Sequence, residues 1–593
     1  MSVKEREDIS EEYKWDLEKI YENQDGWETD FENAKKEVKR LQKMEQEFET
    51  AEELLDTLKQ YEKTMRVAGK VFQYAHMRSD EDKRKSKYQE LESRAKSLLS
   101  DARQASSFLE PAIQGLTEEE IDSMMQGEEE LERYRHYIED IMRSKPHTRS
   151  GEIENILADL GEVLGSSETY SRLSNADLKF PEVETPEGEK VELTQSNFTK
   201  FLKNRDRDFR KEVYEKYYDR IGEFSNTFSS TLENTVKTHA KMAGIRKFDS
   251  ARKNALHGPN IPVSVYDNLV ETVEENVDLL HRLTDLKRKA LGVDEMHMWD
   301  IYVPTAGSEE PEISFEEAKE HVIEAVAPLG EEYQERMKEG IESGWIDVYE
   351  NRGKRSGAYS SGSYDTDPYI LMNYQDDINS MFTLAHELGH SMHSEYSEEN
   401  QPYVYSDYSI FVAEVASTMN EALLTHHLLE NVEDEDFRRH VLSHYLEGFR
   451  GTLFRQAMFA DFEHEIHREV EKGGALTAEK MSEMYREKKE LYYSNAVVDD
   501  RIATEWMRIP HFYYNYYVYQ YATGISAATA LSAKVLKEGK PATEDYLEFL
   551  SSGSSDYPVE VLKKAGVDMT TVKPIERALD EFREHLDEME ALL

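Results

Sequence analysis

The chain contains no cysteine. This excludes disulfide bridges, thiolate metal ligands and a cysteine nucleophile. Long apolar runs are also missing, because no segment approaches the ~18 residues that a membrane-spanning helix needs. The first ten residues, MSVKEREDIS, are polar and lack the apolar segment of a secretory signal. We therefore expect a cytoplasmic protein without a membrane partner.

Basic residues are scarce relative to acidic ones. The chain has 73 Lys and Arg against 122 Asp and Glu, a net charge of -49 at pH 7. A surface of this sign repels nucleic acid, so we do not expect it as a partner. The acids are spread along the whole chain, which favours adaptation to high salt, where screening weakens self-repulsion. An ordinary acidic protein at low salt is the alternative.

Apolar residues make up 38% of the chain, and there are 35 tyrosines. That is enough to build a core, so the protein is predicted to be globular, and 593 residues favour two or three lobes. Residues 10–143 show helical periodicity nearly throughout, with a helix end at Gly115 and a capped restart at Thr117.

Residues 144–196 are punctuated by Pro and Gly and predict a junction with a short strand at 190–193. Helical periodicity returns at 195–291, interrupted by a loop around Pro259. Strands are predicted at 345–349 and 369–374, and helices continue from there to the C-terminus. The pattern indicates a mainly α fold with one small β-sheet.

The string TLAHELGHSMH contains H-E-x-x-H as His386, Glu387 and His390. On a helix, positions four apart share a face, so both imidazoles reach one metal ion. Glu387 lies beside them and is placed to polarise a water molecule without being a ligand. Neutral imidazoles suit zinc. Gly389 costs the helix ~1 kcal/mol relative to Ala, which indicates that something approaches the helix closely there.

A third protein ligand is expected in the next helical run, residues 409–430. Glu414 stands among apolar residues, where an unpaired carboxylate is costly, and a metal is its natural partner. A salt bridge to Lys or Arg is the alternative. Glu421, seven residues on, is placed to hydrogen-bond a ligand histidine, with an ordinary ion pair equally compatible. His393 is expected to pack beneath the site.

The strings HELGHSMH and FVAEVASTMNEALL resemble the thimet-oligopeptidase-like peptidases, in particular their bacterial oligoendopeptidase F branch. The strings EEYKWDLEKIY, RKNALHGPNIPVSVYDNLVE and HFYYNYYVYQYATG are similar too, so the resemblance covers nearly the whole chain. It implies one zinc per chain, bound by His386, His390 and Glu414, with Glu387 as general base. Unlike the thermolysin-type arrangement, this chain has Ser417 and Thr418, and not Asp, three and four residues after the third ligand.

The resemblance also implies a gluzincin-type catalytic region in two helical lobes around a deep channel, with the small sheet beside the metal-binding helices. Residues 1–115 would form an N-terminal helical region, 116–200 a connecting oligoendopeptidase-type domain, and 201–593 the catalytic domain. Such a channel admits short peptides and excludes folded proteins. A monomer or a weak homo-oligomer is expected.

By similarity, residues near the C-terminus contact the substrate carbonyl and the oxyanion. We carry this catalytic role onto His511 and Tyr516, and substrate binding onto Tyr519 and Tyr513. Tyr516 and Tyr519 are three apart and are expected on one helical face. Ordinary packing of a tyrosine stripe is the alternative.

The glycine- and serine-containing loop GKRSGAYSSGSY and the strand after it are expected to bind the peptide backbone by strand addition, at Gly362 and residues 370–374. A surface hairpin explains the same composition. The predicted function is zinc-dependent hydrolysis of internal bonds in short peptides. An exopeptidase, a secreted proteinase and a non-enzymatic helical scaffold are the alternatives. A purely structural zinc gains nothing from Glu387, which speaks against the scaffold.

Overall fold

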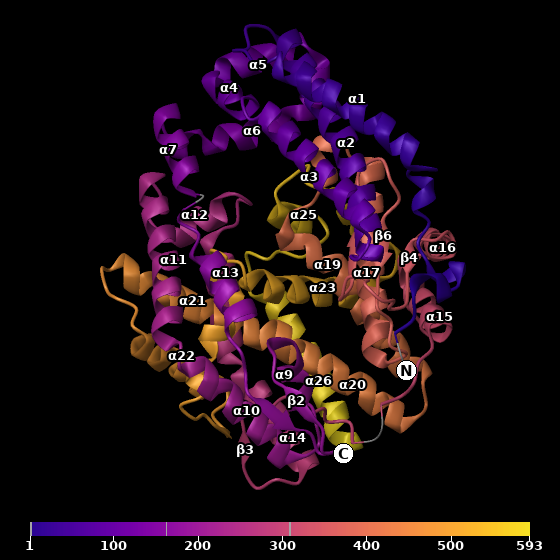
Figure 1. Cartoon of the computed structure of the whole chain (residues 1–593), viewed down its shortest axis with the longest axis vertical. Coiled ribbons are helices and arrows are strands. Elements are labelled where there is room, and N and C mark those ends of the chain that lie inside the picture. The colour runs from indigo at the N-terminus through magenta and orange to yellow at the C-terminus, as the bar shows by residue number, and fades with distance from the viewer. Residues whose placement is uncertain (1–2, 162, 308–309) are drawn as a thin grey trace. The chain divides into compact units, whose positions relative to one another are not determined.

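The structure is a computed structural model that describes residues 3–161, 163–307 and 310–593 (Figure 1). The described residues are mostly helical, and their strands form only three small sheets. The chain divides into two compact units, each built from three separate stretches. Unit 1 comprises residues 1–146, 311–428 and 531–566, and unit 2 comprises residues 147–310, 429–530 and 567–593.

Unit 1 begins with short 3₁₀ turns, followed by helices whose apolar faces meet. Phe31, Val38 and Leu41 are buried, as the periodicity predicts. Thr117 caps the helix after Gly115 through a capping box with Glu120, which confirms the predicted restart. The helices of unit 1 are α1 (Gln24–Gln42), α2 (Ala51–Glu81), α3 (Ser86–Ser106), α4 (Leu109–Gly115), α5 (Glu118–Gly127), α6 (Arg135–Ser144), α15 (Phe315–Ala325), α16 (Glu331–Glu342), α17 (Ile378–Asn400), α18 (Tyr403–Ser406), most of α19 (Ile410–Asn431), the end of α23 (Tyr519–Glu538), α24 (Lys540–Leu550) and α25 (Pro558–Lys564).

A three-stranded sheet of unit 1 lies against α17. It consists of β4 (Ile346–Asp347), β6 (Tyr369–Leu371) and β5 (Tyr359–Ser361), in that order. Strand β6 pairs parallel with β4 and antiparallel with β5. Tyr369 and Leu371 join the core formed by α1, α2 and α3, while β5 and β6 also contact α17. The predicted strands are confirmed, although both are shorter than expected, and the prediction of a mainly α fold with a small sheet beside the motif helix is confirmed.

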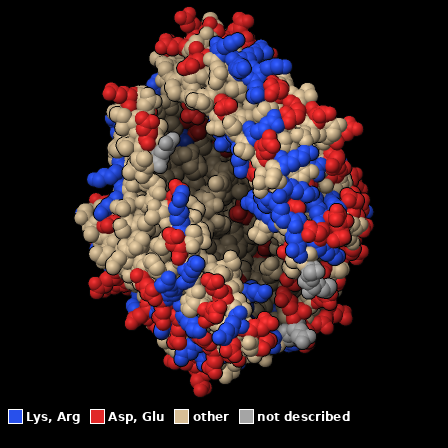
Figure 2. All heavy atoms as spheres, in the orientation of Figure 1, with Lys and Arg blue, Asp and Glu red and all other residues tan. Residues whose placement is uncertain are grey.

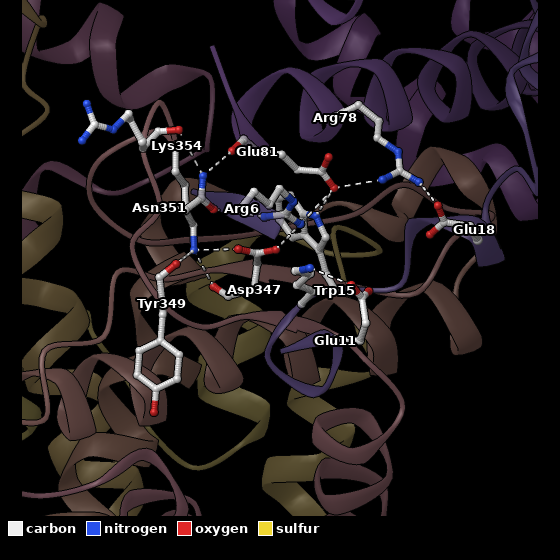
Figure 3. A network of polar contacts seen from close by, with 12 residues as sticks. Arg6, Glu11, Trp15, Glu18, Arg78, Glu81, Asp347, Tyr349, Asn351 and Lys354 are labelled. Carbon is white, nitrogen blue, oxygen red and sulfur yellow. Dashed lines mark hydrogen bonds and ion pairs between the residues drawn. The ribbon is translucent and has the colours of Figure 1, made fainter. Parts of the chain in front are cut away.

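A buried polar network anchors this sheet to the N-terminal segment (Figure 3). Arg6 and Lys354 both point toward Asp347, with Nη2–Oδ2 and Nζ–Oδ1 distances of 2.6 and 2.7 Å. Burial alone would raise the pKa of Asp347, but the two cations outweigh it and lower the pKa. Glu81 of α2 accepts hydrogen bonds from Arg6 and from the indole of Trp15. Strand β4 is therefore held by two ion pairs, and Arg6 links it further to Glu81 of α2.

Unit 2 is also mainly helical. In the segment predicted as a junction, strand β2 (Lys190–Glu192) is present and pairs with β1 (Glu182–Glu184). The same segment holds two helices that were not predicted, because its glycines stand at helix ends rather than inside. The helices of unit 2 are α7 (Gly151–Gly161), α8 (Ser166–Arg172), α9 (Gln195–Leu202), α10 (Arg207–Gly222), α11 (Ser225–Ile245), α12 (Ala251–His257), α13 (Val263–Glu275), α14 (Val277–Leu291), α20 (Glu435–Phe449), α21 (Arg455–Glu471), α22 (Ala478–Tyr492), α26 (Lys573–Leu592), and parts of α19 and α23; β3 (Met296–His297) pairs with β7 (Ala496–Val497).

The acidic residues are distributed as the sequence suggests. On the face drawn in Figure 2, Asp and Glu are mixed with Lys and Arg rather than gathered in one patch. Across the described part of the chain, no helix combines the length and apolarity that crossing a bilayer requires. The predicted channel and the predicted division at residues 115 and 200 stay predictions.

Candidate metal centre

Helix α17 carries the H-E-x-x-H motif and packs closely against α19. The side chain of Asp377 caps α17 by accepting a 2.7 Å hydrogen bond from the amide of Ser380. At Gly389, a Cβ atom would lie only 2.6 Å from the carbonyl oxygen of Ala416 and the Cα of Ser417. The predicted close approach is confirmed, and the partner is the backbone of α19.

The two motif histidines and Glu414 converge on one point. The Nε2 atoms of His386 and His390 are 3.2 Å apart, and they lie 3.3 and 3.7 Å from Oε2 of Glu414. A tetrahedral zinc ion with bonds of about 2.0–2.2 Å separates its ligand atoms by roughly 3.3–3.5 Å. The three side chains therefore fit one zinc ion with a fourth position open, which supports the predicted ligand set.

Two further side chains hold these groups in place. The Nδ1 atom of His386 lies 2.5 Å from Oε1 of Glu421, so the predicted hydrogen bond is present. The hydroxyl of Ser417 donates a 3.2 Å hydrogen bond to Oε2 of Glu414. Ser417 is one of the residues that stand in place of the Asp of the thermolysin-type arrangement. His393 is buried and stacks on Tyr408 with 3.6 Å between ring centroids, as the packing prediction requires.

The electrostatics of the centre favour a cation. Burial would lower the pKa of His386, but hydrogen bonds to Glu414 and Glu421 and their charges raise it well above its ordinary value. Burial and the charge of His386 lower the pKa of His390 to about 4. Burial would raise the pKa of Glu414, yet both histidines and Ser417 lower it to about 2. A divalent ion would replace the proton that these carboxylates hold on His386.

Glu387 lies beside this centre in a different environment. Glu387 is 7% exposed. Its pKa is raised to about 7, and burial is the largest cause. The charge of His386 and a hydrogen bond from the backbone of Ser360 oppose the rise, while Glu414 adds to it. A carboxyl that titrates near neutrality is suited to take up and return a proton. The contact also places β5 next to Glu387.

The position of the strands corrects one expectation. Residues 370–374 were predicted to bind the peptide backbone by strand addition, but β6 is the middle strand and is paired on both sides, so residues 370 and 371 offer no free edge. For these two residues the prediction is wrong, because strand order depends on long-range contacts. Strands β4 and β5 are the two edge strands of this sheet, and Gly362 follows β5 directly. A Cβ on Gly362 would lie 3.3 Å from Pro368 Cα, so glycine suits the tight connection.

The predicted substrate-contacting residues of the tyrosine-rich segment, residues 511–519, belong to unit 2. Tyr516 has a left-handed φ of 54° and donates its amide to Glu463 at 2.7 Å, while its hydroxyl lies 3.1 Å from Nδ1 of His464. Helix α23 begins only at Tyr519, so the expectation that Tyr516 and Tyr519 share a helical face is wrong. Both rings instead pack against Tyr266.

Tyr513 and His511, the other predicted residues of this segment, also contact neighbouring side chains. The hydroxyl of Tyr513 lies 2.7 Å from that of Thr231. His511 sits in a 3₁₀ turn (Pro510–Tyr513), and burial lowers its pKa. Tyr514, which the sequence reasoning did not select, is 52% exposed, and its ring centroid lies 6.1 Å from that of His511. Catalytic and substrate-binding roles for this segment stay predictions.

Comparison with known proteins gives matches along nearly the whole chain. The family model for peptidase family M3 matches residues 200–581, and the one for oligopeptidase F matches residues 113–180. The chain is 48% identical to oligopeptidase PepF of Bacillus subtilis (strain 168) over 591 residues, covering 99% of this chain and 88% of the relative. It is 41% identical to group B oligopeptidase PepB of Streptococcus agalactiae serotype III (strain NEM316), covering 99% and 98%. The crystal structure of oligoendopeptidase-F from Enterococcus faecium is similar with a TM-score of 0.74 at 39% identity, covering 95% and 98%.

Proposed function

Since this chain belongs to peptidase family M3, we propose that it cleaves internal bonds of short peptides with a zinc ion held by His386, His390 and Glu414. Its family and its relatives identify the chain as a metalloendopeptidase that hydrolyses peptide bonds of oligopeptides. The alternative of a helical scaffold without enzymatic activity is thereby excluded. The observation that carries the zinc proposal is the triangle of ligand atoms, with edges of 3.2, 3.3 and 3.7 Å.

Glu387 is the proposed general base. When bound, zinc lowers the pKa of a coordinated water toward neutrality and polarises the substrate carbonyl. Glu387 accepts the proton of the attacking water and then donates it to the leaving amine. Burial raises the pKa of Glu387, which favours its uptake of the proton. Glu421 fixes the ring of His386 through Nδ1, which leaves Nε2 on the side of Glu414, where it would bind the zinc ion.

The peptide backbone is proposed to bind along β5. Among the residues that the structure describes, this strand is paired on one side only, and the backbone of Ser360 reaches Glu387. An extended peptide that adds to the free edge of β5 would therefore bring its carbonyls close to the base. Gly362 keeps the following turn narrow. His511 and Tyr516 are proposed to contact the substrate carbonyl and the oxyanion, and Tyr519 and Tyr513 to bind substrate.

Cleavage of peptides of increasing length, with zinc measured in parallel, tests the proposed function. We expect internal cleavage of short peptides, no cleavage of a folded protein, and loss of activity when a chelator removes the zinc. Release of single residues from peptide ends would favour an exopeptidase. Digestion of folded proteins would favour a general proteinase. A cytoplasmic location and a monomeric or weakly associated state stay predictions.

A further inference from the structure

A second group of metal-ligating side chains lies in unit 1, outside the peptidase centre. His321 and Glu324 of α15 and His427 of α19 bring one ligand atom each to within 4.8 Å of one another. Over the residues that the structure describes, the only other group that meets this criterion is His386, His390 and Glu414. No local spacing in the sequence marks this group, because its members come from two helices that are about 100 residues apart in the chain.

The second group is separate from the first, although both use α19. His427 follows Glu414 by 13 residues, and a helix rises ~1.5 Å per residue, so the two lie about 20 Å apart along α19. His321 and Glu324 are three residues apart and therefore share one face of α15. Helix α15 also packs against α17, the helix that carries the peptidase motif.

The distance between His427 and Glu324 suits shared coordination better than a direct hydrogen bond. Nε2 of His427 lies 3.5 Å from Oε2 of Glu324, beyond the ~2.7–3.2 Å of a good hydrogen bond. Two ligands of one tetrahedral zinc ion lie roughly 3.4 Å apart. The rings of His321 and His427 have centroids 5.7 Å apart and are inclined at 60°, so they do not simply stack.

Burial gives a second, independent indication. The Nδ1 atom of His321 is shielded from solvent and has no hydrogen-bond partner among the described residues, which is costly for a polar atom. The side chain of His427 is 14% exposed, whereas that of Glu324 is 67% exposed. The group is thus closed on its imidazole side and open to water at its carboxylate, which gives a metal ion a route of entry.

We propose that His321, Glu324 and His427 bind a divalent transition-metal ion of the zinc type, in addition to the peptidase zinc. Two imidazoles and one carboxylate match zinc, whereas calcium and magnesium prefer an all-oxygen set. The net charge of -49 raises the local concentration of cations. The ion would clip α15 to α19. The expected single zinc per chain describes the peptidase centre alone, and a fully loaded chain holds two.

Zinc titration of the full-length, chelator-stripped chain tests this site without using activity. The variant H386A/H390A lacks the peptidase ligands, and we expect it to bind one zinc ion at micromolar concentration. Adding H321A and H427A removes that binding, whereas adding H426A, the neighbouring histidine outside the group, leaves it intact. Circular dichroism checks that each variant is folded.

Two further measurements keep the outcome decisive. Co²⁺ added to H386A/H390A is expected to give the visible absorption bands of a low-symmetry site, and these bands disappear with H427A. E324Q changes only an exposed side chain and is expected to weaken zinc binding about tenfold or more. If H386A/H390A binds no zinc at micromolar concentration, or if its zinc survives removal of His321 and His427, the site does not exist.

Discussion

Glu387 combines burial with a position next to His386 and His390, the two proposed metal ligands, and this makes it the most informative residue to change. Glu387→Gln keeps the shape of the side chain and removes its ability to accept a proton. We expect kcat to fall at least about 10³-fold while zinc stays bound, because the ligands are untouched. Steady-state kinetics with zinc quantification on the same sample measure both. Turnover like that of the wild type would contradict the assignment of the base.

Glu398, near the end of α17, is expected to make the stability of the fold depend on pH. Burial, followed by the charges of Asp365, Asp407 and Glu395, raises its pKa from 4.5 to about 8. The folded chain therefore binds this proton more tightly than the unfolded chain. The resulting stabilisation is complete below about pH 4.5 and is lost as the pH rises through about 8.

Glu398→Gln carries a neutral amide at every pH, so it should match the wild type at about pH 5 and exceed its stability by more than ~1 kcal/mol at about pH 9. Thermal unfolding across this range measures the difference. Glu483→Gln removes the same charge from an exposed position within α22 and controls for net charge. A stability difference between Glu398→Gln and the wild type that does not change with pH would refute the prediction.

At the residue scale, the sequence predicts best where local spacing decides. His386 and His390 follow from a four-residue repeat on a helix, and Glu421 follows from its distance to Glu414. Tyr516 could not be placed in the same way. Its left-handed backbone is held by Glu463, which is distant in sequence, and no local signal marks a non-glycine residue for that conformation.

Gly389 links the residue scale to the packing of whole elements. In Gly389→Ala, the new Cβ would lie 2.6 Å from the backbone of α19, so α19 must shift and carry Glu414 with it. We expect a stability loss of about 1–3 kcal/mol from overpacking and a lower zinc affinity. Thermal unfolding and competition with a chelator measure these effects.

Gly448→Ala is the matched control, because Gly448 lies within α20 and a Cβ there meets nothing within 4 Å. This control should be neutral or slightly stabilising, since alanine favours a helix by about 1 kcal/mol relative to glycine. Equal effects of the two substitutions would show that helix propensity, and not the contact between α17 and α19, determines the outcome.

At the scale of secondary-structure elements, the sequence predicts that strands are present but not their order in the sheet. The alternation of apolar residues finds β4 and β6 in the sequence, yet it contains no information on which strand lies at the edge. Strand β5 was hidden in a loop rich in Gly and Ser, and its pairing with β6 makes β6 the central strand. The helices α7 and α8 were missed because glycines at their ends resemble those of an extended linker.

At the scale of the whole molecule, each compact unit is assembled from three separate stretches of chain. Periodicity reports only on neighbours in sequence, so it could predict helical lobes but not which helices make up each one. The resemblance to a peptidase family carried more information than any local pattern, because it covers nearly the whole chain.

The net charge of -49 leads to a prediction for the molecule as a whole. Salt has two opposite effects on such a protein. It weakens exposed ion pairs such as that between Arg84 and Glu5, which lowers stability by a small amount per pair. It also screens repulsion among the excess carboxylates, over a distance that shrinks from about 30 Å at 0.01 M to about 3 Å at 1 M. Because the acids outnumber the bases by 122 to 73, repulsion should dominate.

We therefore expect the thermal unfolding midpoint and the activity to rise with KCl from low to molar concentration. A parallel series in sucrose, which favours compact states without screening charge, separates screening from solvent exclusion. A midpoint that rises in KCl more than in sucrose would support adaptation to high salt. A midpoint that is indifferent to KCl would mean that local ion pairs already balance the repulsion, and the chain would then be an ordinary acidic protein.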